Sequence, residues 1–122
     1  MRFLMMHRLD ESVPEAWNPS QEFMERMGGF IQESLEKGIL ITGEGVLPSE
    51  TGALVRKTKN AKVTITDGPF TEAKEVIGGF ALINAADRAE AVAFAETYTQ
   101  LFEGIEIEVE VRQIAEFEDV SA

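Results

Sequence analysis

The sequence predicts an α+β domain with the element order β-α-β-β-α-β. Two segments place apolar residues three and four positions apart, which is typical of amphipathic helices. Four other segments are short apolar or alternating runs, which are typical of strands. The 122 residues match the length of one ordinary domain, and no linker rich in Pro, Gly or Ser divides them. We therefore expect a single domain over residues 1–122.

The first strand is expected at residues 3–8, an apolar run closed by charge. A helix should follow, with Asn18 as its N-cap and Pro19 at its first position. Gly38 is expected to end this helix in the left-handed conformation. The apolar face of the helix comprises Phe23, Met27, Phe30, Ile31 and Leu35.

Residues 39–47 predict the second strand. Segments 53–58 and 62–66 predict an inserted β-hairpin, followed by Asp67-Gly68-Pro69, which has turn chemistry. Residues 76–84 predict the third core strand.

The second helix is expected to open with a capping box formed by Asp87 and Glu90 and to end at Gly104. The last strand, residues 105–117, begins with strict alternation of apolar and charged side chains. Without the hairpin, these elements match the split βαβ, or ferredoxin-like, arrangement, with two helices on one face of an antiparallel sheet. The apolar stripe of the second helix comprises Ala91, Phe94, Ala95, Tyr98, Leu101 and Phe102.

The two strands expected at the centre of the sheet do not alternate. Residues 3–6 and 76–83 are apolar almost throughout, so apolar side chains must also point away from the helices. An exposed patch of that size is uncommon on a soluble monomer. We expect a homodimer in which a second copy covers this face. The alternative is that loops or the inserted hairpin fold over it.

Composition excludes several classes of site and partner. The absence of cysteine excludes disulfides, zinc–cysteine sites, iron–sulfur ligation and thiol catalysis. Acidic residues outnumber basic residues by 22 to 11, and the resulting net charge of −11 argues against nucleic-acid and membrane binding. The apolar N-terminal run is too short for a signal peptide, and no segment has the length of a transmembrane helix. The expected location is the cytoplasm.

One motif resembles a known family. The run Asp67-Gly68-Pro69-Phe70-Thr71-Glu72-Ala73-Lys74-Glu75, followed by Gly78-Gly79-Phe80, is similar to the signature of the DGPF family in the YciI-like (YCII-related) superfamily. The resemblance spans the whole chain and departs at Gln113, where the family usually has Pro. It implies a dimeric α+β barrel. A few YciI-like proteins are dehalogenating lyases acting on substituted hydroquinones, for which a His–Asp pair has been proposed as the catalytic core.

His7 is the single histidine, so imidazole chemistry must use it. In the expected topology it ends the first strand near the segment 67–75 that leads into the third. We predict His7 as a general base whose tautomer is set by a hydrogen bond to Asp67. The alternative is that a backbone group satisfies His7, while Asp67 only closes its turn.

Other side chains at this end are candidates for ligand binding. Lys74, with Glu72 and Glu75, could bind an anionic substrate group or serve as an acid, or could form an ordinary surface ion pair. Trp17, Phe70 and Phe80 could line a pocket for an aromatic ligand, or could fill core. Glu106, Glu108 and Glu110 lie in line without a histidine and make a poor transition-metal site, so no metal or cofactor is expected.

Two functional classes follow from these expectations. One is a cofactor-independent lyase or isomerase for a small cyclic or aromatic metabolite. The other is a non-catalytic dimeric protein that binds a small ligand or acts as an accessory protein.

Overall fold

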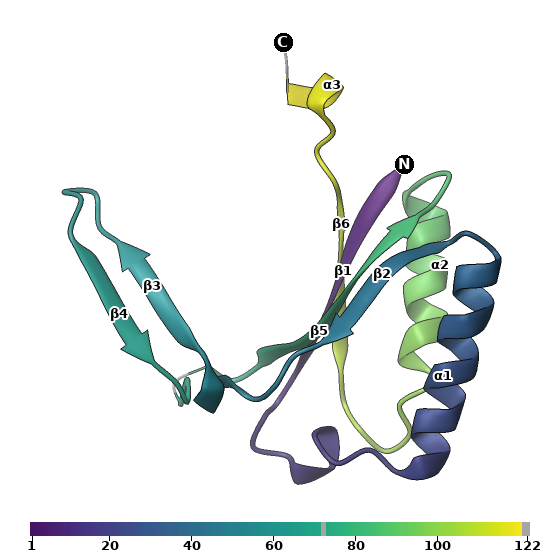
Figure 1. Ribbon diagram of the computed structural model, residues 1–122, viewed down its shortest axis with the longest axis horizontal. Coiled ribbons are helices and arrows are strands. Elements are labelled where there is room, and N and C mark those ends of the chain that lie inside the picture. Colours follow the sequence, from purple (N-terminus) through teal and green to yellow (C-terminus); the bar gives the residue numbers. More distant parts are fainter. Residues whose placement is uncertain (72, 121–122) are drawn as a thin grey trace.

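The computed structural model describes residues 1–71 and 73–120 and confirms the predicted ferredoxin-like α+β class. Its main sheet has four antiparallel strands in the order β2-β5-β1-β6. Two helices, α1 and α2, cover one face of this sheet (Figure 1). The main elements are β1 (Arg2–Leu9), α1 (Gln21–Glu36), β2 (Leu40–Gly45), β5 (Val76–Asn84), α2 (Arg88–Thr99) and β6 (Glu108–Gln113).

The helix ends follow the local signals with one exception. Asp87 caps α2 by accepting a hydrogen bond from the Glu90 backbone N–H, as predicted. Gly38 follows α1 with a φ of 74°, also as predicted. The prediction of Asn18 as N-cap was wrong. Ser20 accepts the hydrogen bond from Phe23 N–H and caps α1, whereas the Asn18 amide turns back to donate to the carbonyl of Pro14.

Strand β1 lies between β5 and β6, and its side chains alternate between the two faces of the sheet. Phe3 and Met5 are buried on the face that the helices cover, and His7 continues this alternation. Leu4 and Met6 point to the opposite face, where they oppose Leu82 and Phe80 of β5. The central strands are therefore apolar on both faces, as the sequence predicted.

The core is small and is built mainly under α2. Ala91 and Ala95 are buried against Phe3, Met5 and Ile83, and these small side chains let α2 approach the sheet closely. Helix α1, by contrast, carries large apolar side chains on the side that faces the sheet. All of its residues are described, and Ser34 is the only one that is buried. Helix α2 therefore packs on the core, whereas α1 leaves most of its apolar face unburied.

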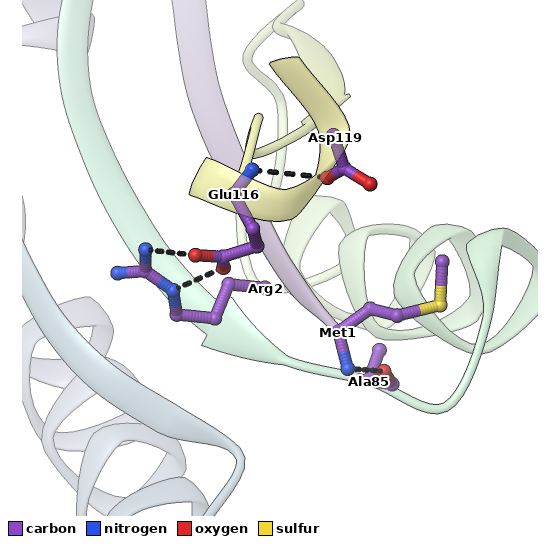
Figure 2. Close-up of polar contacts among 5 residues, drawn as sticks. All are labelled: Met1, Arg2, Ala85, Glu116 and Asp119. Atoms are coloured by element: carbon purple, nitrogen blue, oxygen red, sulfur yellow. Dashed lines mark hydrogen bonds and ion pairs between the residues drawn. The ribbon is translucent and has the colours of Figure 1, made fainter. Parts of the chain in front are cut away.

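The C-terminal segment differs from the prediction. Strand β6 covers only the middle of the predicted range, because its pairing with β1 runs over residues 108–113 and ends with a hydrogen bond of 2.9 Å from the Ile114 backbone N–H to the carbonyl of Arg2. A short helix, α3 (Phe117–Val120), follows. Figure 2 shows how this segment is tied to the N-terminus: the Arg2 guanidinium donates two hydrogen bonds, of 2.7 and 2.9 Å, to the Glu116 carboxylate.

The inserted hairpin forms as predicted, from β3 (Ala53–Lys57) and β4 (Val63–Asp67). Two single-turn 3₁₀ helices precede it in the chain. The first, η1 (Pro14–Ala16), lies between β1 and α1, and the second, η2 (Ser49–Thr51), lies between β2 and β3. It is a separate two-stranded sheet that projects on the side of the main sheet opposite the helices (Figure 1). All residues of both strands are exposed.

Candidate functional site

A cavity of about 440 Å³ lies between the two helices and the sheet. Its volume is in the range typical of small-molecule sites. Two residues of α1 in its wall, Ile31 and Leu35, are 39% and 50% exposed. The aromatic residues of the wall are Phe23, Phe30, Phe94, Tyr98 and Phe102, and its other apolar side chains include Met5, Met27, Leu40, Ala81 and Val109.

His7 and Tyr98 form a hydrogen-bonded pair in the cavity wall. The Nδ1 atom of His7 lies 2.8 Å from the Tyr98 hydroxyl oxygen. The imidazole and the Phe102 ring pack in a T-shaped arrangement, with ring centroids 5.2 Å apart. The other ring nitrogen, Nε2, is buried without a hydrogen-bond partner in the described part of the chain.

Gly78 and Gly79 make room for the imidazole ring. A Cβ atom at position 78 would lie 2.9 Å from His7 Nε2 and equally close to a methyl carbon of Leu9. At position 79 it would lie 3.1 Å from the carbonyl oxygen of Glu44 on β2. Both glycines therefore serve close packing of β5 against its neighbours.

Both members of the pair are neutral near pH 7. Burial lowers the pKa of His7, since the imidazolium would be desolvated. Burial also raises the pKa of Tyr98 to about 12, so its hydroxyl keeps its proton. The pair can therefore exchange hydrogen bonds with a ligand without presenting a net charge.

The predicted hydrogen bond between His7 and Asp67 is absent from the described residues, and Tyr98 takes its place. The alternation of β1 turns the His7 ring toward the helices, together with Phe3 and Met5. Asp67 is exposed at the end of β4, where it pairs with Ala53 across the hairpin. The structure thus does not bring the two predicted catalytic residues together.

The Asp67–Phe70 motif instead fastens the base of the hairpin. Gly68 packs so tightly that a Cβ atom there would lie 1.7 Å from the carbonyl oxygen of Ser49. The Phe70 backbone N–H donates to the Ser49 hydroxyl at 2.8 Å. Ser49 in turn donates through its hydroxyl and its backbone N–H to the carboxylate of Glu11. Glycine is required at position 68 because no side chain fits.

The other predicted binding residues do not line the cavity. The Trp17 indole donates to the carbonyl of Glu11 at 3.2 Å. Phe70 is half-buried at the hairpin base, whereas Lys74 and Glu75 are exposed. Glu72 lies outside the described residues. Hydrogen bonds from Ser12 lower the pKa of Asp10, and the nearby charge of Lys74 lowers it further.

Sequence reasoning missed Tyr98 and Phe102 as site residues because they read as parts of a helix stripe. One signal was available. Tyr98 is the single tyrosine of the chain, and a buried tyrosine hydroxyl requires a polar partner. His7, at alternating spacing from Phe3 and Met5, was a suitable partner.

We expect protonation of His7 to make stability pH-dependent. Between the lowered pKa of the folded state and about 6.5, the unfolded chain binds a proton that the folded chain does not. The free energy of unfolding should therefore fall as pH drops below about 6.5, by at most about 1.4 kcal/mol per pH unit. Urea denaturation between pH 7.5 and 5.5 measures this slope, and His7→Gln should flatten it. An equal slope in both proteins would contradict the assignment.

Residues 1–71 and 73–120 hold no helix of the length and apolarity needed to cross a membrane. In the same ranges, no three or more His, Cys, Asp and Glu side chains gather as metal ligands would.

The fold and the cavity define an α+β protein with a ferredoxin-like sheet and an apolar chamber beneath its helices. A model of the YCII-related domain matches residues 1–118. An uncharacterized protein of Rhizobium meliloti (strain 1021) is 33% identical over 88 residues, which cover 70% of each chain. The chain belongs to the YCII-related family, as its motif indicated.

Proposed function

We propose that this protein binds a small cyclic or aromatic metabolite in the cavity between the helices and the sheet. The observation that carries the proposal is the cavity itself, about 440 Å³ in volume, with a largely apolar wall and the His7–Tyr98 pair. Small-molecule sites are typically apolar chambers of this size with a few polar groups that orient the ligand.

The wall indicates the chemistry of the ligand. Aromatic rings from both helices favour offset or edge contacts with a flat, ring-containing compound. The Tyr98 hydroxyl offers a hydrogen bond to one polar substituent. Since His7 and Tyr98 are both neutral, an uncharged ligand is favoured over an ionised one.

A second candidate is a cofactor-independent lyase or isomerase that uses the same cavity. Neutral His7 can accept a proton at Nδ1, and the Tyr98 hydroxyl lies 2.8 Å from that atom. A proton could pass from the ligand to the Tyr98 oxygen while the Tyr98 proton passes to His7. Ligand binding ranks first because Nε2 is buried away from any partner among the described residues and Asp67 does not orient the ring.

A thermal-shift screen of small cyclic compounds tests the binding proposal. A ligand present at 100 times its dissociation constant stabilises the folded state by about 2.7 kcal/mol, which should raise Tm by several degrees. The NMR spectrum of each hit after incubation with the protein then separates binding from turnover. Absence of any stabilising compound among flat, uncharged rings would contradict the proposal.

Two variants locate the binding site of a hit. Ala81→Leu should fill part of the cavity and weaken binding at least about 10-fold, and Tyr98→Phe should weaken it by a smaller factor by removing one hydrogen bond. Val92→Leu adds a methylene at an exposed position of α2 and serves as the control. Equal affinity of all three variants would place the ligand elsewhere.

We also propose that the protein is a homodimer assembled through the sheet face opposite the helices. Support comes from the apolar strip formed by Leu4, Met6, Leu82 and Phe80, of which Phe80 is 39% exposed. Ion pairs of Glu110 with Arg8 and Arg112 border this strip along β6. An apolar strip with a charged margin is typical of a protein interface.

A further inference from the structure

We propose that the β3–β4 hairpin is an arm that embraces the second subunit. The inference rests on the proposed dimer and adds a second contact to it. The hairpin projects on the same side of the main sheet as the apolar strip, away from the helices (Figure 1). A copy placed on that strip would therefore lie between the sheet and the hairpin.

The hairpin lacks apolar cover within its own subunit. Val55 opposes Ile65 and Lys57 opposes Val63, so the three apolar residues share one face of the two-stranded sheet. Val55, Ile65 and Val63 are 71%, 68% and 57% exposed. Two-stranded hairpins are marginally stable alone in water. Packing of this face on another chain would remove that weakness.

Charge indicates that this other chain is a second copy of the same protein. Residues 53–67 contain four basic residues and one acidic residue, a net charge of 4 − 1 = +3. The remainder of the chain then carries −11 − 3 = −14. A positive arm is attracted to the negative body of another subunit, whereas two arms repel each other. The four basic residues are Arg56, Lys57, Lys59 and Lys62.

The base of the hairpin is built to hold the arm in one direction. The Gly68 N–H donates to the carbonyl of Gly52 at 2.9 Å, which closes the two strands. The contacts of Gly68 and Phe70 with Ser49 anchor that base to the body. Pre-organisation of this kind lowers the entropic cost of docking.

Sedimentation equilibrium of hairpin variants tests the arm. Val55→Asp/Ile65→Asp should raise the dimer dissociation constant at least about 100-fold, since apolar anchors become charged. Met24→Asp/Val92→Asp adds the same charge at exposed helix positions and should leave the constant within about threefold. If the hairpin variant matches this control while the wild type is dimeric, the arm is wrong and the dimer stands. A monomeric wild type overturns both.

Cross-linking identifies what the arm touches. A refolded mixture of unlabelled and nitrogen-15-labelled protein is treated with a carbodiimide, which joins lysine amines to carboxylates in contact. Peptides that link Lys57, Lys59 or Lys62 to a carboxylate outside residues 53–67 should combine both isotopes. Links within one isotope only would overturn the proposal and leave the basic arm to another partner, such as a polyanion.

Discussion

Gly68→Ala is expected to lower the free energy of unfolding by about 3 kcal/mol or more. The new methyl group would lie 1.7 Å from the carbonyl oxygen of Ser49 and 2.6 Å from its carbonyl carbon. Neither atom belongs to a flexible side chain, so the backbone at Ser49 must move. That movement would also disturb the hydrogen bonds of Ser49 with Glu11 and Phe70.

Gly28→Ala is the matched control for this substitution. Gly28 lies in α1, and a methyl group there would meet nothing within 4 Å. Because alanine is the better helix former, this variant should gain about 0.5–1 kcal/mol. Urea denaturation followed by circular dichroism measures both values. Equal stability of the Gly68→Ala protein and the wild type would show that the hairpin base is not packed as described.

Leu4→Glu is expected to convert the proposed dimer to monomers, with a dissociation constant raised at least about 1,000-fold. Leu4 lies on the central strand of the exposed sheet face, opposite Leu82. In a two-fold interface each substitution introduces two carboxylates, and both would be desolvated. The fold itself should survive, because Arg112 on β6 directly opposes position 4 and can pair with the new carboxylate.

Sedimentation equilibrium across micromolar concentrations checks this result. Met24→Glu on α1, where the native side chain is 61% exposed, should remain dimeric and serves as the control. An unchanged circular dichroism spectrum would show that Leu4→Glu is folded. A folded Leu4→Glu protein that sediments as a dimer would exclude the strip around Leu4 as the interface.

Most of the fold was predictable because its signals are local. The cap at Asp87 and the left-handed Gly38 depend on residues a few positions away. Errors arose where local signals competed. The side chain of Ser20, rather than that of Asn18, accepts the hydrogen bond from the Phe23 N–H at the start of α1. Residues 105–107 alternate like a strand, but no strand in the described part of the chain pairs with them.

The site was less predictable than the fold. His7 was identified as the residue for imidazole chemistry, but its partner is Tyr98, 91 positions away. Gly78 and Gly79 leave space for the imidazole ring of His7. A pair of glycines in a strand predicts a close contact, but it does not identify the residue that makes the contact. The Asp67–Phe70 motif indicated the family correctly, but its described contacts hold the hairpin base rather than the cavity.

The amino-acid sequence by itself determined the class of sheet, the two helices, the inserted hairpin and the apolar strip that faces away from the helices. Periodicity and capping encode these features because backbone preferences act over a few residues. Only the tertiary structure decided that a cavity lies between the helices and the sheet and that it contains His7 and Tyr98. That outcome depends on the burial of Ala91 and Ala95 of α2 in the core, while the apolar face of α1 stays largely unburied. Packing depends on side chains from distant parts of the sequence, and no short segment contains all of them.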